Sequence, residues 1–191
     1  MKEIVLASAN KKKIEELKAL LPHILVQSLS DIGFDKNIEE PFFTFEENAF
    51  QKANTIYQFC GKNILADDSG ICVPALQNKP GVLSARYAGV NATDQENLDK
   101  LIVEMQFHPN KSAFYKAVLC LIWDGTVHYF EGECYGTLVS KASGSNGFGY
   151  DPIFIPDGYQ QTFAELPPTV KHQISHRAKA MKKLIAFLEN Q

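Results

Sequence analysis

Two adjacent carboxylates, Asp67 and Asp68, stand in the stretch Ala66-Asp67-Asp68-Ser69-Gly70. An apolar run over residues 63–66 precedes them, and a short apolar run that stops at turn residues predicts a buried strand. Ligands of open α/β sheets collect at the carboxyl ends of strands, where both carboxylates would lie. Charged carboxylates are costly there unless they are paired or bind a metal. We therefore expect at least one to bind a divalent cation and activate water; the alternative is a turn whose aspartates cap backbone amides.

A second candidate site lies where the first predicted strand, residues 4–7, leads into a helix. Such a junction offers free backbone N–H groups and the positive end of the helix dipole to an anion. The dipole disfavours cations in the first turn, so helix stability does not explain the lysines found there. Binding of a phosphate chain would explain them. The alternative is a solvated lysine run, and the missing glycines exclude a Walker motif. The candidate residues are Ser8, Ala9, Asn10, Lys11, Lys12 and Lys13.

A long helix is predicted from the capping box Thr44–Glu47 to about residue 59. Asn48 and Lys52 share one polar stripe of this helix. The simplest interpretation is that both face solvent; the alternative is that Lys52 reaches a phosphate. Glu40, just before the cap, is a candidate second metal carboxylate.

A glycine-rich loop with aromatic residues covers residues 144–152. Its three glycines allow a ligand to approach the backbone closely. Phe148 and Tyr150 could sandwich a planar base, and Asp151 could accept a hydrogen bond from a ring N–H. A bare hairpin loop is the alternative, and the spacing does not match a Rossmann fingerprint.

Near the end of the chain, Ser175 is a predicted helix N-cap. His176 and Arg177 follow in the first turn, where cations are unfavourable for the dipole. Both residues would make sense as donors to a ligand oxygen.

The elements that position these groups predict an α/β fold. Runs that alternate between strand and helix patterns favour a sheet with helices packed on it. The dipeptide Asp124-Gly125 joins two β-prone runs and predicts a hairpin, so the sheet should be mixed. A second capping box, Thr93–Glu96, predicts another helix. Further strands are expected at residues 24–29, 113–123, 127–135 and 153–155.

Composition narrows the classes of function. The 191 residues are 45% hydrophobic and 21% charged, which is ordinary for a globular domain. The net charge of −3 gives no reason to expect nucleic acid as a partner, and no apolar run approaches the length of a membrane span. Four scattered cysteines without a C-x-x-C pair make a zinc site unlikely and suit a reduced, cytoplasmic chain. The N-terminal apolar run is too short for a signal peptide.

Six motifs in order along the chain resemble the inosine triphosphate pyrophosphatase family, also called the noncanonical purine nucleoside triphosphate pyrophosphatases. The motifs are Ser8-x-Asn10-x-x-Lys13, Thr44-Phe45-x-Glu47-Asn48-Ala49-x-x-Lys52-Ala53, Ala66-Asp67-Asp68-Ser69-Gly70, Pro80-Gly81-x-x-Ser84-Ala85-Arg86-Tyr87, Gly147-Phe148-Gly149-Tyr150-Asp151-Pro152 and Ser175-His176-Arg177. The resemblance implies one domain over residues 1–191, with an elongated two-lobed mixed sheet flanked by helices and an active-site cleft between the lobes. It also implies a homodimer.

The activity implied by this resemblance is Mg²⁺-dependent hydrolysis of ITP, dITP and XTP to the nucleoside monophosphate and pyrophosphate, which removes deaminated purines from the nucleotide pool. On this chain, Glu40 and Asp68 would hold Mg²⁺, and Asp68 would be the catalytic base. Ser8 to Lys13, Lys52 and Ser69 would bind the triphosphate. The base would lie among Phe148, Gly149, Tyr150, Asp151, Lys171, His176 and Arg177.

Donors from His176 or Arg177 would suit a purine with a 6-oxo acceptor. The amino group of adenine would leave a donor facing a donor, at a cost of about 1–3 kcal/mol. Two alternatives stay open: a pyrophosphatase for pyrimidine or methylated nucleotides, and a nucleotide sensor without turnover.

Overall fold

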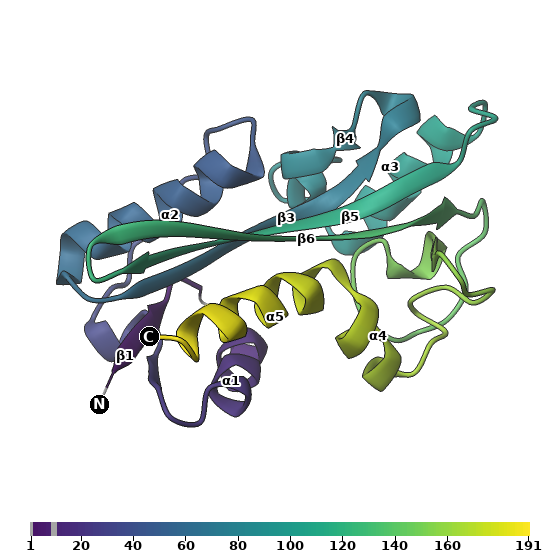
Figure 1. Ribbon diagram of the computed structural model, residues 1–191. Helices are drawn as coiled ribbons and strands as arrows, with labels where there is room; N and C mark the ends of the chain where they lie inside the picture. The colour runs from purple at the N-terminus through teal and green to yellow at the C-terminus, as the bar shows by residue number, and fades with distance from the viewer. Residues whose placement is uncertain (1, 9–10) are drawn as a thin grey trace. The chain divides into compact units, whose positions relative to one another are not determined.

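The computed structural model (Figure 1) describes residues 2–8 and 11–191. The strands in this part of the chain are β1 (Glu3–Leu6), β2 (Leu25–Gln27), β3 (Ile64–Val73), β4 (Lys79–Pro80), β5 (Ser112–Trp123), β6 (Thr126–Leu138) and β7 (Phe154–Pro156). The α-helices are α1 (Lys11–Leu20), α2 (Phe45–Cys60), α3 (Asp94–Met105), α4 (Pro168–Ile174) and α5 (His176–Leu188). Short 3-10 helices are η1 (Ser30–Ile32), η2 (Pro74–Leu76), η3 (Gly81–Arg86) and η4 (Asp151–Ile153).

The strands form one seven-stranded sheet in the order β2-β1-β3-β5-β6-β7, with β4 paired to β3. β1 is parallel to β2 and β3, whereas β4 is antiparallel to β3 and β7 is antiparallel to β6. The sheet is therefore mixed, as predicted from the hairpin. The turn of that hairpin is Asp124-Gly125, and both residues have positive φ (48° and 80°), which is the geometry that Asp-Gly favours in two-residue hairpins.

The chain divides into two compact units. The first comprises the described residues of 1–68, 118–131 and 180–191, and the second comprises 69–117 and 132–179. The boundaries fall within β3, β5, β6 and α5. The single domain and the cleft between lobes that the family resemblance implies stay predictions.

In the first unit, α2 lies on one face of the strands, and α1 and the C-terminal part of α5 lie on the other (Figure 1). The apolar face of α2 packs onto the strands, because Ala49, Ala53 and Ile56 are fully buried. Thr44 accepts a hydrogen bond from Glu47 N at 3.2 Å, so the predicted cap is confirmed. In α1, Ile14 and Leu17 are buried, whereas Leu20 at the end of the helix is exposed.

In the second unit, α3 packs its apolar face onto the strands. The capping box at Thr93 that starts this helix is confirmed. Leu98, Leu101 and Met105 are buried in one cluster. Its other fully or nearly buried members are Ile71, Val73, Tyr87, Ala113, Tyr115, Cys134, Leu138, Tyr150, Ile153, Phe154, Phe163 and Leu166. These residues form one continuous apolar core in the second unit.

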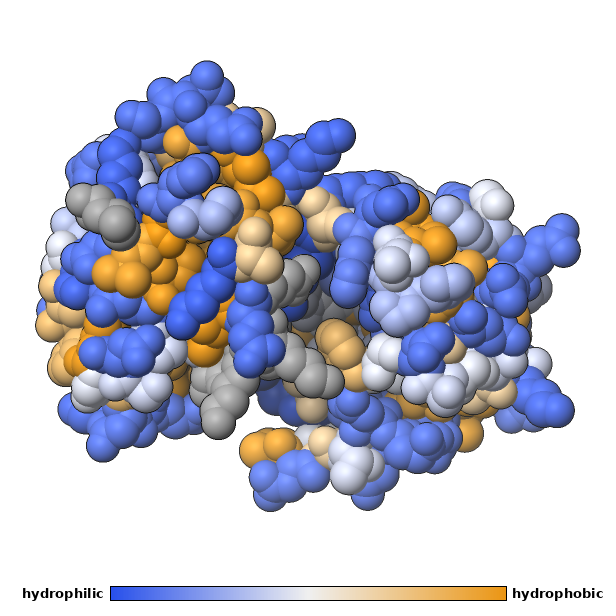
Figure 2. Space-filling model, turned by 90° about the horizontal axis from the view of Figure 1, so that it is seen from below, coloured by the Kyte–Doolittle hydropathy of each residue, from blue (hydrophilic) through white to orange (hydrophobic). Residues whose placement is uncertain are grey.

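The surface is mostly hydrophilic, with several separate apolar patches on the face shown in Figure 2. Scattered exposed apolar residues are normal for a folded domain. Within residues 2–8 and 11–191, no helix is long and apolar enough to cross a membrane.

Candidate functional site

Strand β3 carries the two central carboxylates, and it does not stop at them. The sequence predicted a strand end and a turn at residues 67–70, but β3 continues to Val73. The apolar residues that follow Gly70 extend the strand into the second unit. Gly70 itself is required by packing, because a Cβ there would collide with Gly81 O and Ser84 Oγ.

The carboxylates nevertheless lie beyond the end of a strand. β1 pairs with β3 in parallel, with Leu6 opposite Leu65, and β1 ends at Leu6. Asp67 and Asp68 therefore lie past the carboxyl end of β1, where ligands of α/β sheets collect. The predicted location was right, but it is the neighbouring strand that ends there.

An ammonium group from α2 joins two carboxylates in the first unit. Lys52 Nζ donates to Glu40 Oε1 at 2.6 Å and to Asp68 Oδ1 at 3.1 Å. Lys52 is only 9% exposed and Asp68 only 8%. The simplest interpretation of the polar stripe, exposure to solvent, is therefore wrong for Lys52, because the two carboxylates compensate its burial. These three residues form the carboxylate–lysine cluster.

Asn48 fixes the segment that carries Glu40. Its side chain is fully buried, accepts from Phe42 N at 3.0 Å and donates to Phe42 O at 3.1 Å. A side-chain amide that satisfies both backbone groups of one residue holds that residue in one conformation. Glu40 lies two residues before Phe42 in the sequence. Asn48 therefore restricts the backbone from which the Glu40 side chain reaches Lys52.

The protonation of the carboxylate–lysine cluster follows from burial and charge. Burial raises the pKa of the Asp68 carboxyl from its ordinary 3.8 to about 6, although the Lys52 ammonium lowers it. Burial lowers the pKa of Lys52, but the carboxylates of Asp68, Asp67 and Glu40 outweigh that effect and keep its pKa above the ordinary value. Near neutral pH, Asp68 is therefore mostly ionised yet able to take up a proton, and Lys52 is charged.

The same cluster fits a divalent cation. Asp68 Oδ2 is buried and has no hydrogen-bond partner within the described part of the chain, and a buried carboxylate oxygen is costly without a donor or a cation. No group of three or more His, Cys, Asp or Glu residues suited to a metal occurs among residues 2–8 and 11–191. Mg²⁺ commonly uses one or two carboxylates together with substrate phosphates, so Glu40 and Asp68 are a sufficient protein set for it.

A second polar cluster lies in the second unit around Asp151, which is 2% exposed. Its Oδ2 accepts from Phe148 N at 2.9 Å and from the Lys171 ammonium. Lys171 Nζ lies 4.9 Å from the centre of the Phe148 ring, and that ring is 71% exposed. An exposed flat ring beside a cation is suited to stacking a heteroaromatic base.

Glycine is needed at two positions of this loop. Gly147 has φ +78°, and a Cβ there would collide with the Asp151 carboxylate. Gly149 has φ +60°, and its N–H donates to Asp94 Oδ2 at 3.1 Å. The loop is therefore held by two carboxylates, that of Asp151 within the loop and that of Asp94 at the start of α3.

Tyr150 does not take part in a sandwich with Phe148. Its ring is 4% exposed and belongs to the apolar cluster of the second unit, and its hydroxyl donates to Ser84 O at 2.8 Å. The predicted sandwich is thus wrong for Tyr150, because burial of this ring in the core leaves no free face. Of the two, Phe148 alone offers an exposed ring.

Helix α5 begins at His176, and Ser175 Oγ accepts from Ala178 N at 3.2 Å, so the predicted N-cap is confirmed. His176 and Arg177 lie half-buried in the first turn. The imidazole of His176 stacks on the Tyr115 ring, with centroids 4.8 Å apart and planes at 10°. The second unit thus brings Phe148, Lys171, Asp151 and His176 into one connected group.

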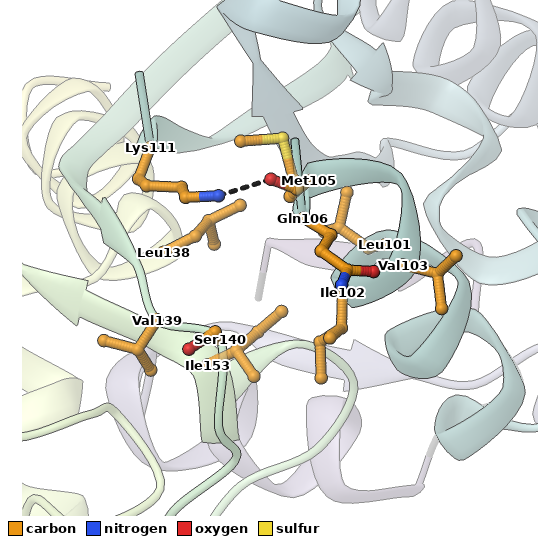
Figure 3. Close-up of a pocket in the computed structure, with 10 residues that line it drawn as sticks. All are labelled: Leu101, Ile102, Val103, Met105, Gln106, Lys111, Leu138, Val139, Ser140 and Ile153. Carbon is orange, nitrogen blue, oxygen red and sulfur yellow. Dashed lines mark hydrogen bonds between the residues drawn. The ribbon is translucent and has the colours of Figure 1, made fainter. Parts of the chain in front are cut away.

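A pocket of about 330 Å³ also lies in the second unit, at the C-terminal end of α3 (Figure 3). Apolar side chains surround most of it, and Lys111 points to the carbonyl of Met105 at its edge. Its ten lining residues, labelled in Figure 3, include none of the predicted site residues.

Comparison with known proteins identifies the chain. The Ham1 family model matches residues 4–187. The chain belongs to the Ham1 family. A dITP/XTP pyrophosphatase of Flavobacterium psychrophilum is 46% identical over 189 residues, which cover 98% of this chain and 100% of that protein. One from Aliarcobacter butzleri is 46% identical over 195 residues, which cover 98% of both chains.

Solved structures of Ham1 proteins have the same fold. The Ham1 protein of Staphylococcus aureus aligns with a TM-score of 0.95 at 40% identity, covering 99% of each chain. A HAM1 protein from Coxiella burnetii aligns with a TM-score of 0.96 at 38% identity, covering 100% of each chain. The family predicted from the six motifs is therefore confirmed, and so is its mixed α/β fold.

Several predicted site residues of this Ham1 protein lie in or near its first loop. Ser8 lies two residues after the end of β1 and is half-buried, and Ser69 is half-buried within β3. The predictions for Ala9 and Asn10 lie outside the described residues. Lys11, Lys12 and Lys13 form the first turn of α1, and their side chains also lie outside the described part. Phosphate binding by these residues stays a prediction.

Two residues with clear roles in this Ham1 structure were missed as site residues. Asn48 was read as part of a solvent-facing stripe, and Tyr115 was read as part of a β-strand only. The place of Asn48 four residues before Lys52, on the same helix face, was a usable signal. Tyr115 gave none, since alternation alone does not reveal that its ring meets a histidine 61 residues later.

Proposed function

We propose that this Ham1 protein hydrolyses noncanonical purine nucleoside triphosphates, with ITP, dITP and XTP as substrates, to the monophosphate and pyrophosphate. Its relatives that are dITP/XTP pyrophosphatases, at 46% identity over nearly full length, support this activity. The observation that carries it is the carboxylate–lysine cluster, in which Asp68 is buried, has a raised pKa and has one oxygen without a hydrogen-bond partner among the described residues. Such a carboxylate is suited to accepting a proton from water.

The reaction proceeds by attack of water on the α-phosphorus. Asp68 takes one proton from the attacking water, and the oxygen of that water forms a bond to the α-phosphorus. The bond between the α-phosphorus and the bridging α–β oxygen breaks. Pyrophosphate leaves with the electron pair. Lys52 compensates negative charge on the phosphates, and it also keeps Asp68 ionised at neutral pH. A positioned general base of this kind contributes about 10²–10⁴-fold to a rate.

Glu40 and Asp68 are the residues that would hold Mg²⁺. When bound, the ion would neutralise phosphate oxygens and orient the substrate. Asp68 Oδ2, which has no hydrogen-bond partner within residues 2–8 and 11–191, supports this assignment. Ser8 to Lys13 and Ser69 are proposed to donate to the triphosphate, since helix N-termini and lysines favour phosphate.

The purine is proposed to stack on Phe148 beside Lys171 and Gly149. His176 and Arg177 donate to the 6-oxo group, which adenine lacks. Asp151 contributes mainly by holding Phe148 and Lys171 in place, because its carboxylate already accepts hydrogen bonds from Phe148 N and Lys171. We also propose a homodimer and a cytoplasmic location, where nucleotides are made and where four free cysteines would stay reduced.

The test is release of pyrophosphate from ITP, XTP, dITP, GTP, ATP, TTP and UTP, with Mg²⁺ or with EDTA. We expect ITP, dITP and XTP to be turned over far ahead of the others and only with Mg²⁺. Faster turnover of TTP or UTP would favour a pyrophosphatase for other modified nucleotides. Binding of ITP without any turnover would favour a sensor, and either outcome would refute the proposal.

A further inference from the structure

Tyr115 on β5 contacts two members of the candidate base site, although no motif includes it. Its ring stacks on the imidazole of His176, and its hydroxyl lies 3.4 Å from Asp151 Oδ1. On the basis of the proposed function, we propose that Tyr115 is a positioning residue for purine recognition. It fixes the plane of the His176 ring and, through Asp151, the places of Lys171 and Phe148.

The stacking contact determines how the imidazole can point. The two rings are nearly parallel, at 10° with centroids 4.8 Å apart, so Tyr115 covers one face of His176. The terminal torsion of a histidine is otherwise broad. A covered face limits rotation and keeps the ring nitrogens in one plane. A donor held in a fixed plane can distinguish an oxo from an amino substituent, which a rotating donor would do less well.

The hydroxyl contact completes the surroundings of Asp151. Oδ2 of Asp151 accepts from Phe148 N and from Lys171, which leaves Oδ1 for Tyr115. Burial, and then the Asp151 charge, raise the pKa of Tyr115 well above its ordinary value. The phenol therefore stays protonated and can only donate to the carboxylate. With both oxygens engaged, Asp151 cannot turn and release Lys171 from the Phe148 ring.

The apolar core makes Tyr115 a rigid support. Its ring meets Phe154 edge-on, with centroids 4.8 Å apart at 72°, and Phe163 at 6.1 Å. Only 7% of Tyr115 is exposed, so its effect on purine recognition passes through His176 and Asp151 rather than through contact with the substrate. An aliphatic residue would fill the same core but would supply neither the flat face nor the donor.

The experiment compares two variants with two matched controls. Tyr115→Leu removes the ring face and the hydroxyl, whereas Tyr115→Phe removes only the hydroxyl. Phe114→Leu removes an aromatic residue from the neighbouring position of β5, where it stacks on Tyr135. Tyr135→Phe removes a hydroxyl that donates to the Glu133 carboxylate at 2.6 Å. Each variant is assayed with ITP and ATP for kcat and KM, after circular dichroism confirms folding.

We expect Tyr115→Leu to raise KM for ITP about tenfold and to lower the ratio of kcat/KM for ITP over ATP about tenfold, since an aromatic pair contributes about 0.5–1.5 kcal/mol. Tyr115→Phe should retain the stack and change both quantities about threefold. The kcat for ITP should change less than twofold in both variants, and the controls should match wild type. A structural defect alone would lower activity on both substrates equally.

The outcomes separate the two proposals. A wild-type protein that turns over ITP, together with unchanged KM and unchanged ITP:ATP ratios in both Tyr115 variants, would overturn the role of Tyr115 only. A wild-type protein without pyrophosphate release from ITP would overturn the proposed function and this role with it. If Tyr115→Leu does not fold, Tyr115→Phe decides by the same two measurements.

Discussion

Replacing Asp68 by Asn tests the carboxylate–lysine cluster most directly. The substitution keeps the shape of the side chain and an acceptor oxygen for Lys52, which donates to Oδ1 at 3.1 Å. It removes the negative charge and the ability to accept a proton. Because a general base contributes about 10²–10⁴-fold, we expect kcat for ITP at pH 7.5 to fall by at least about a hundredfold.

The same substitution should not destabilise the fold. The pKa of Asp68 rises from 3.8 to about 6 on folding, a difference of about 2, which is worth about 3 kcal/mol. The stability that this group contributes is present below pH 3.8 and is lost as the pH rises through about 6. Asn does not ionise, so the variant escapes this loss above pH 6. The raised pKa already includes the opposing effect of the Lys52 ammonium, so at pH 7.5 we expect stability equal to or above that of wild type.

Two assays on the same preparations separate catalysis from stability. Pyrophosphate release from ITP gives kcat, and urea unfolding at pH 4.5 and pH 7.5 gives the free energy of unfolding. Asp124→Asn is the matched control, because it makes the same chemical change in the exposed hairpin turn, where φ is +48° and Asn is tolerated. Near-normal turnover by Asp68→Asn would refute its role as base. A loss of several kcal/mol at pH 7.5 would refute the reasoning on its raised pKa.

Further predictions concern pH and neighbouring residues. In the Mg²⁺-free wild-type protein the Asp68 carboxyl should titrate near pH 6, because burial raises its pKa, and an NMR titration that finds the ordinary value of 3.8 would contradict this. Lys52→Met should move that titration to higher pH, because a cation that lowers the pKa of Asp68 is lost; the measurement is the same NMR titration without Mg²⁺. Asn48→Ala should cost about 1–3 kcal/mol in urea unfolding, since the backbone N–H and C=O of Phe42 both lose their hydrogen bonds to the Asn48 side chain. Gly147→Ala should cost about 1–3 kcal/mol through its positive φ and raise KM for ITP.

Much of the architecture follows from local patterns. The capping residues at Thr44, Thr93 and Ser175 set the starts of three helices, because few residue types satisfy the free N–H groups of a first turn. Asp124-Gly125 determined the hairpin for a similar reason. These features depend on neighbours in sequence, so the sequence alone was sufficient to find them.

What failed depended on neighbours distant in sequence. Residues 67–70 look like a turn, yet β3 continues through them because the lack of a side chain at Gly70 lets η3 pack against the strand. Tyr150 looks like a base-stacking residue, yet its ring enters the core. Helix α4, which carries Lys171, was not predicted, since a seven-residue helix shows little periodicity. The pairing of Lys52 with Glu40 was equally invisible, because both would be expected at the surface.

The continuity of β3 has a consequence for how this region can vary. Side chains of a strand alternate between the two faces of the sheet, and a shift of one residue exchanges those faces. An inserted or deleted residue between Ala66 and Gly70 would therefore move Ile71 and Val73, both members of the apolar cluster of the second unit, to the opposite face of the strand. Besides the side chains that the site and the packing at Gly70 require, this segment therefore also requires its length, so insertions and deletions should be excluded here.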